Sequence, residues 1–203
     1  MRILLLTRYD HSGPSSRYRF YQFFPSLEKE NIEFSVSPLF NEKYVRNLYY
    51  GKKMGKLYNP IVAHLKRTAT LLFNQSCDLV WMEKEALPWI PPYVESIFYK
   101  KSIPYIIDYD DAVFHRYDEH PNPIVRYILS KKIKTVMARS SVVVAGNKYI
   151  AYYAEKAGAQ KVQIIPTVVD LSKYRIKRRF DSSNFTIGWL GSPTTSRHIN
   201  IAE

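Results

Sequence analysis

Seven short apolar runs alternate with longer segments along this chain, and this alternation constrains the fold more than any other feature. Several runs are almost continuously apolar, as is expected of strands covered on both faces of a sheet. The segments between them are long enough to hold helices, so the pattern predicts right-handed crossovers and a doubly wound, mostly parallel α/β sheet. The predicted strands are residues 2–7, 32–37, 78–82, 104–107, 141–145, 162–166 and 185–190.

Helix signals lie between these runs. Asn59 and Asn122 each precede a proline, which places an amide cap before a residue suited to the first helical turn. Asn147 predicts the start of a helix that ends at Gly158. After the second of the prolines, apolar residues at spacings of three and four predict one continuous helix face. The residues of this face are Val125, Ile128, Leu129, Ile133, Val136 and Met137.

The end of the chain has the features of a boundary between two domains. Residues 1–170 contain six of the seven predicted strands and are expected to form one domain. Residues 171–184 are predicted to be a basic linker, and residues 185–203 carry the seventh strand and the start of a helix. We therefore expect the chain to be the amino-terminal part of a two-domain protein and to be inactive alone.

Positive charge is clustered in this sequence. The chain has 30 Lys and Arg against 18 Asp and Glu, a net charge of +12, and seven cations with no acid lie between Lys43 and Arg67. This charge favours an anionic partner, either a nucleic acid, an anionic membrane surface or a phosphorylated small molecule, unless it only keeps the surface soluble. No nucleic-acid-binding signature occurs, and the acids at 108–111 would repel phosphates, so nucleic acid is disfavoured.

Residues 38–58 are predicted to be an unusually long irregular loop, and such a loop is usually functional or mobile. Its cations and aromatic rings can bind lipid phosphates and the headgroup region of an anionic membrane, or a phosphate-bearing acceptor. The residues expected to do so are Tyr49, Tyr50, Lys52, Lys53 and Lys56.

The cellular location follows from what the sequence lacks. Cys77 is the only cysteine, and the apolar run at residues 3–6 is too short for a signal peptide. No stretch approaches the roughly 18 uninterrupted apolar residues of a spanning helix. We expect a cytoplasmic protein that either stays in solution or lies at the inner face of the membrane.

The residues after the first predicted strand can form an anion site. Gly13 permits a tight turn, and Ser15 or Ser16 can cap the helix that follows, whose first N–H groups would then face a phosphate. Arg17 and Arg19 can add charged contacts. An ordinary strand-to-helix turn is the alternative. The segment lacks the three-glycine dinucleotide fingerprint, which disfavours a nicotinamide enzyme.

The densest polar cluster follows the fourth predicted strand. Asp108, Asp110 and Asp111 repel one another unless a cation, a sugar hydroxyl or Arg116 lies among them. Such a cluster suits hydrogen bonding to a polyol or metal coordination, although one of the acids can simply cap a turn. His115 can be catalytic or merely structural. The spacings typical of zinc sites and of the serine-hydrolase elbow do not occur.

Six sequence blocks, taken in order, resemble the bacterial family-4 glycosyltransferases. These enzymes have the GT-B architecture of two facing Rossmann-like domains, and this chain is similar to the amino-terminal, acceptor-side half. The resemblance implies retaining transfer of a sugar from a nucleotide sugar to a glycan or lipid-linked acceptor, with no metal and no cofactor. The blocks are residues 13–19 (GPSSRYR), 78–92 (DLVWMEKEALPWIPP), 108–117 (DYDDAVFHRY), 145–147 (AGN), 165–170 (IPTVVD) and 185–193 (FTIGWLGSP).

The resemblance also implies roles for individual residues. Gly13 would approach the donor diphosphate. Asp110 and Asp111 stand where the family has a His-Asp pair that contacts the transferred sugar, so the histidine role is absent or has moved to His115. Residues 166–170 depart from the family's linker motif, and the donor-binding Glu-x7-Glu segment would lie outside the chain. The remaining expected substrate-binding residues are Ser15, Ser16, Arg17, Arg19, Glu83, Lys84, Asp108, Arg116, Asn147, Thr167, Gly191 and Ser192.

The same residues leave a second function open. A non-catalytic domain that binds a sugar or a nucleotide would have the same fold and the same polar strand ends. It would bind a glycan without needing a second domain, which separates it from a transferase.

Overall fold

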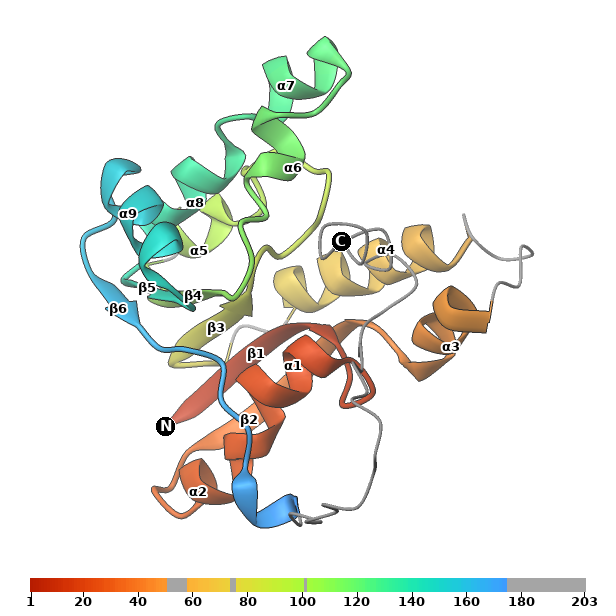
Figure 1. Cartoon of the computed structure of the whole chain (residues 1–203), viewed down its shortest axis with the longest axis vertical. Coiled ribbons are helices and arrows are strands. Elements are labelled where there is room, and N and C mark those ends of the chain that lie inside the picture. Colours follow the sequence, from red (N-terminus) through yellow and green to blue (C-terminus); the bar gives the residue numbers. More distant parts are fainter. Residues whose placement is uncertain (51–57, 74–75, 101, 175–203) are drawn as a thin grey trace, which may run out of the picture.

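The computed structural model describes residues 1–50, 58–73, 76–100 and 102–174 (Figure 1). Within these residues, six strands form one all-parallel sheet in the order β2-β1-β3-β4-β5-β6. The doubly wound α/β prediction and its first six strands are confirmed, and the seventh predicted strand lies outside the described residues. The strands are β1 (Arg2–Tyr9), β2 (Glu33–Phe40), β3 (Leu79–Glu83), β4 (Tyr105–Tyr109), β5 (Val142–Ala145) and β6 (Val162–Ile164).

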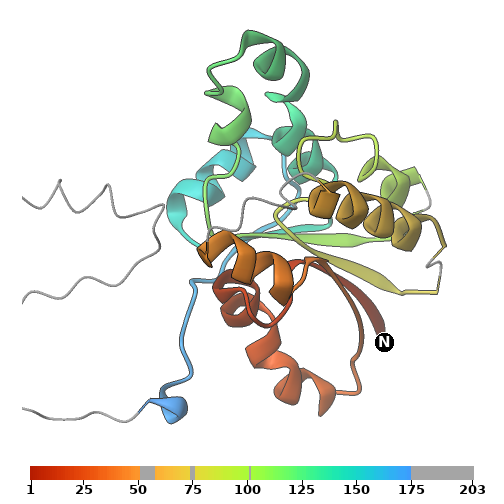
Figure 2. The same cartoon turned by 90° about the vertical axis from the view of Figure 1, so that its right-hand side faces the viewer.

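Helices cover both faces of the sheet (Figures 1 and 2). Helices α1, η1 and α2 lie on one face, and α4, α5, α8 and α9 lie on the other. Among the described residues the helices are α1 (Pro14–Arg19), η1 (Tyr21–Phe23), α2 (Phe24–Glu28), α3 (Glu42–Tyr50), α4 (Tyr58–Phe73), α5 (Ser96–Lys100), α6 (His115–Asp118), α7 (Pro123–Leu129), α8 (Lys132–Arg139), α9 (Lys148–Lys156) and η2 (Leu171–Lys173). None of them is long and apolar enough to cross a membrane.

The core lies mainly between the sheet and the second set of helices. Leu4 and Leu6 of β1 are fully buried in one apolar cluster with Leu71 of α4. On the opposite face, the ring of Phe20 packs edge-on against Trp81 of β3, with the ring centroids 5.2 Å apart. Successive side chains of a strand point to opposite faces of the sheet, and both faces are covered here. This explains why the strand sequences are almost continuously apolar.

The order of the strands creates a switch point between β1 and β3. Leu4 of β1 pairs with Ser35 of β2 on one side and with Val80 of β3 on the other. The chain therefore passes from β1 to β2 on one side of β1 and then crosses back to form β3 on its other side. Ligands of doubly wound sheets bind beyond the carboxyl ends of the strands at such a point.

The predicted continuous helix after Pro123 is wrong, because the chain breaks between α7 and α8. Helix α8 buries Ile133, Val136 and Met137, whereas Ile128 of α7 is half exposed. Figure 1 shows α7 standing away from the sheet. The three-and-four spacing continues across the break, so the spacing alone could not reveal that the face is divided between two helices. Helix α7 contributes only Leu129 and the partly buried Val125 to the core.

The predicted irregular loop is wrong over its first part. Strand β2 continues to Phe40, and α3 follows. The Asn41 side chain accepts the Tyr44 N–H at 3.1 Å, and the Asp10 carboxylate accepts the Glu42 N–H at 2.6 Å. The Tyr44 ring stacks on Phe40 at 4.1 Å. Asp10, which is distant in sequence, and the ring stack thus stabilise α3, a helix that the local sequence alone does not predict.

Two other predictions concern this region: the residues expected to bind a membrane or an acceptor, and the start of the next helix. Tyr49 and Tyr50 belong to α3, and Lys52, Lys53 and Lys56 lie outside the described residues. Helix α4 begins at Tyr58, so the prediction that Asn59 precedes it is wrong.

The two other predicted amide caps are confirmed. The side chain of Asn122 accepts the Ile124 N–H at 2.9 Å, and that of Asn147 accepts the Ile150 N–H at 3.0 Å. Helix α9 ends two residues before Gly158, which has a φ of +86°. The left-handed backbone there is the reason for a glycine at this helix end.

Candidate functional site

Polar side chains from β1, β3 and β4 meet at the carboxyl edge of the sheet. Glu83 ends β3 and is buried, and its carboxylate accepts the Arg8 N–H at 2.7 Å and the hydroxyls of Ser15 at 2.9 Å and Ser16 at 2.6 Å. One buried carboxylate therefore holds the whole turn between β1 and α1 against β3 at the switch point.

This arrangement corrects the predicted helix cap. The N-cap of α1 is Gly13, which makes no side-chain contact, and both serines lie inside the helix. Their hydroxyls bind Glu83 instead, because a buried carboxylate needs donors more than an exposed helix end does. The predicted tight turn is present, since the Gly13 N–H donates to the Asp10 carbonyl at 3.0 Å.

Gly13 is required by a close approach rather than by its own backbone angles. Its φ is −82°, which any residue can adopt. A Cβ at this position would lie 2.3 Å from the Cβ of Tyr9, well inside van der Waals contact. The turn can therefore hold its present shape only with a glycine.

Lys84 is the cation that the acidic cluster requires. Its Nζ lies 2.8 Å from Asp110 Oδ1 and 2.9 Å from Asp111 Oδ2, and its side chain is buried. Its φ of +63° is left-handed. Burial opposes the charge of Lys84, but the two carboxylates outweigh burial and raise its pKa. The cation thus comes from the neighbouring strand and not from the local Arg116.

The two aspartates differ in what they can offer a ligand. Asp110 is mostly buried, and its Oδ1 faces Lys84. Its Oδ2 lies 2.6 Å from the Ser15 hydroxyl, whose single proton it shares with Glu83. Burial opposes its charge, but Lys84 and Ser15 together lower the pKa of Asp110. The side chain of Asp111 is 72% exposed and contacts only Lys84 among the described residues. Asp111 is therefore the carboxylate with a free oxygen, and Asp110 is held rigidly behind it.

Arg19 is committed to the interior. Its guanidinium binds Asp108 Oδ1 through Nε at 2.9 Å and Nη2 at 2.7 Å. Its Nη1 donates to the Ile165 carbonyl at 2.6 Å and lies 3.4 Å from the Thr167 hydroxyl. Arg19 thus joins α1, β4 and the segment after β6. By contrast Arg17 is exposed at the start of the site.

We expect the Asp108 carboxyl to titrate near neutral pH. Burial raises its pKa from 3.8 to about 7, and Arg19 offsets only part of this shift. Because the folded pKa exceeds the unfolded one, the stabilising contribution of the protonated carboxyl is complete below pH 3.8 and is lost as the pH rises through about 7. Carbon-13 NMR of the carboxyls measures this, and Arg19→Met should move the midpoint higher still. A midpoint of about 4 would contradict this assignment.

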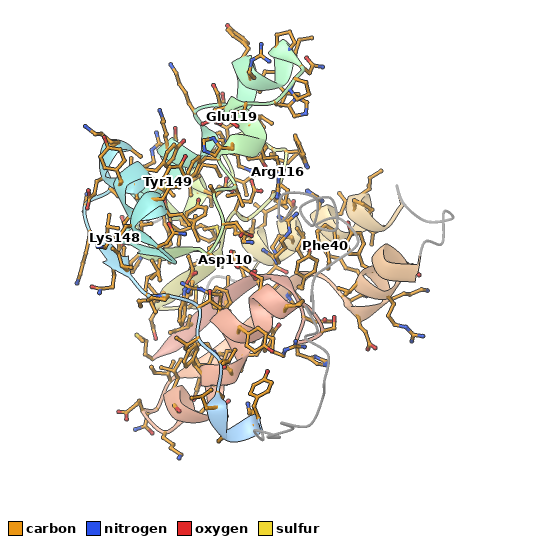
Figure 3. All side chains as sticks on the ribbon, viewed as in Figure 1. Phe40, Asp110, Arg116, Glu119, Lys148 and Tyr149 are labelled. Atoms are coloured by element: carbon orange, nitrogen blue, oxygen red, sulfur yellow. The ribbon has the colours of Figure 1, made fainter. Side chains whose placement is uncertain are left out.

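His115 turns toward α9 and its own helix. Its Nδ1 lies 3.1 Å from Asp118 Oδ1 and 2.9 Å from Glu119 Oε1, and its Nε2 lies 2.6 Å from the Tyr149 hydroxyl. Figure 3 shows Glu119 above Asp110 and Tyr149 above and to the left of it. Among the described residues His115, Asp118 and Glu119 are the group whose ligand atoms lie close enough to hold a metal ion.

Arg116 pairs with Glu85, and no ion pair joins it to the two aspartates among the described residues. Its Nη1 lies 3.5 Å from Glu85, which is buried and accepts Lys132 Nζ at 2.7 Å and the Tyr117 hydroxyl at 2.7 Å. Lys132 is completely buried and also donates to the Leu87 carbonyl. Sequence analysis missed this network, because Lys132 lies in a run of surface-like lysines and nothing local marks it as buried.

Arg67 was missed for a similar reason. It is buried, and its Nη2 donates to the carbonyls of Thr7 at 2.7 Å and Ser37 at 2.6 Å. Burial lowers its pKa to about 10. The guanidinium clamps β1 and β2 together just before their carboxyl ends. The available signal was its spacing, because Arg67 lies four residues before the buried Leu71 and therefore on the same face of α4.

The remaining predicted residues fall into two groups. Asn147 caps α9 next to the site, and a Cβ on the adjacent Gly146 would lie 3.1 Å from Asp110 Cα. Thr167 is held against Arg19. Gly191 and Ser192 lie outside the described residues.

The fold and this edge define a class: a Rossmann-like α/β domain with a six-stranded parallel sheet and a polar cluster at its switch point. No family model matches the chain. No curated protein matches it either.

Proposed function

We propose that the chain is the acceptor-side half of a retaining glycosyltransferase of the family-4 type, which moves a sugar from a nucleotide sugar to a glycan or lipid-linked acceptor. The observation that carries the proposal is the Asp110–Lys84–Asp111 cluster at the switch point. Its carboxylates can accept hydrogen bonds from the hydroxyls of a sugar. Lys84 and Ser15 lower the pKa of Asp110, which favours the ionised carboxylate.

The charges of the site suggest how a donor would lie. The edge carries more acid than a diphosphate tolerates near Asp110 and Asp111. The diphosphate would instead approach Gly13, next to which Arg17 is exposed. The sugar would then extend toward Asp111, which holds it for attack by the acceptor. Donor contacts from a second domain would complete the site.

A sugar-binding domain without catalysis is the second candidate. Both oxygens of Asp110 already have partners, and His115 is bound by Tyr149 and its own acids. An edge with one free carboxylate suffices to bind a polyol but provides no nucleophile of its own.

The test is a transfer assay on the longer protein that contains this chain. A set of nucleotide sugars is offered with lipid-linked and glycan acceptors, and the anomeric configuration of the product is read by NMR. The proposal predicts transfer with retention that persists in a metal chelator. An inverted product would contradict the retaining mechanism. Sugar binding without transfer would favour the second candidate.

A further inference from the structure

Helix α4 is apolar on the face that points away from the protein. Its inner face includes the buried Leu71. On the outer face, the exposed fractions are 58% for Ile61, 65% for Leu65, 45% for Leu72 and 82% for Phe73. Their spacing of four, seven and one residues keeps them on one side of the helix. A helix that covers a core on one face normally carries polar residues on the other.

The apolar surface continues beyond the helix. His64 of α4 lies between two carbonyls, with Nδ1 2.7 Å from Pro60 and Nε2 3.0 Å from Pro88. This contact places Pro88 beside α4. The next residue, Trp89, packs its ring edge-on against Tyr117 and His120 and is 47% exposed, and Ile90 is 38% exposed. We call the whole set the α4 surface: Ile61, Leu65, Leu72, Phe73, Trp89 and Ile90.

The charge around the α4 surface is mostly positive. No acid occurs from Lys43 to Cys77, a stretch that contains α4, all of α3 except its first residue Glu42, and the seven cations between Lys43 and Arg67. Lys66 is exposed on α4 itself, and Lys43 is exposed on α3. The two helices are neighbours, because Tyr44 of α3 and Ala63 of α4 pack against the same apolar cluster.

These observations distinguish between two partners for the α4 surface, a second copy of the chain and an anionic bilayer. A second copy of the chain would bring two proteins of net charge +12 together through their most basic region. An anionic bilayer offers acyl chains to the apolar residues and negative headgroups to the cations around them. We propose that the α4 surface docks on an anionic lipid membrane, with α4 lying in the plane of the interface. Trp89 sits at the edge of this surface, where an indole ring favours the headgroup region.

This inference does not depend on the transferase proposal, because membrane binding requires neither a donor nor an acceptor. Taken with the transferase proposal, membrane docking implies that a lipid-linked acceptor would reach the domain from the side of α4. The binding assay below uses no sugar, so its failure and a failure of the transfer assay are separate results.

The test measures binding of the full chain to vesicles of phosphatidylglycerol and phosphatidylcholine by co-sedimentation. Leu65→Gln combined with Phe73→Gln should weaken binding by roughly thirtyfold, since two apolar side chains no longer enter the interface and the net charge is unchanged. Leu171→Gln is the control, because Leu171 is 76% exposed on η2, which both views place far from α4. This control should bind like the parent.

A second variant separates charge from apolar contact. Replacing Lys52, Lys53 and Lys56 together by Gln should weaken binding by roughly a hundredfold at low salt. This difference should fade as salt shortens the Debye length, whereas the effect of the α4 double variant should persist.

Fluorescence locates the contact. Brominated lipids in the vesicles should quench Trp89, and Trp89→Phe should remove the quenching. The proposal is overturned if the folded parent does not bind anionic vesicles at low salt, or if the α4 double variant binds as well as the parent. A lipid-free dimer that the double variant dissociates would assign the surface to a second copy instead.

Discussion

Replacing Lys132 by alanine is expected to remove about 3–5 kcal/mol of folding free energy, the largest effect on stability foreseen for any single residue here. Lys132 is completely buried and ion-paired with Glu85 at 2.7 Å. Its loss leaves the Glu85 carboxylate in the interior without its closest cation, and it also leaves the Leu87 carbonyl without a donor. Urea denaturation followed by circular dichroism measures the change.

The neighbouring Lys131 provides the control. It is exposed, and Lys131→Ala should change the free energy of unfolding by less than about 0.5 kcal/mol. Combining Lys132→Met with Glu85→Gln should give a more stable protein than Lys132→Met alone, because the uncompensated charge is gone. Equal stability of the two single alanine variants would show that the Glu85–Lys132 pair does not stabilise the fold.

Replacing Asp110 by alanine should lower the turnover of the proposed transferase by roughly 30- to 1000-fold, which corresponds to about 2–4 kcal/mol. Asp110 is held by Lys84 and by Ser15, so it is preorganised where the proposed sugar lies. Steady-state kinetics with the preferred nucleotide sugar measure the change, and circular dichroism checks that the variant is folded.

Glu155→Ala is the matched control, because Glu155 is an exposed acid near the far end of α9. It should keep parental turnover. Asp111→Ala should reduce turnover as well, since Asp111 offers the free oxygen. Parental turnover in a folded Asp110→Ala variant would move the proposed role to Asp111 or His115.

The strands could be predicted from sequence because burial on both faces leaves a purely local mark. All six predicted strands within the described residues are present, and their ends shift by only a few residues. The helices were harder. Helix α8 is held by Lys132 reaching Glu85, and α3 by Asp10 reaching the Glu42 N–H, and both contacts join residues far apart in the chain.

The candidate site could likewise be predicted only where its residues are marked by the local sequence. The polar residues at the strand ends could be predicted, because parallel strands end at one edge. Their partners could not. Nothing local indicates that Ser15 and Ser16 bind Glu83 rather than cap their helix, or that Arg19 turns inward to Asp108. Pairings of this kind depend on the register between strands, which a single sequence does not contain.

Lys84 has consequences for how this position can vary among related proteins. A left-handed backbone costs a residue with a Cβ about 1–2 kcal/mol, and a glycine would avoid that cost. A lysine stands there, and its ammonium pairs with the two aspartates after the next strand, which a glycine could not do. Position 84 therefore combines an unfavourable backbone conformation with a favourable charge. Relatives that keep both aspartates should keep the cation, and relatives that lose them should be free to turn to glycine.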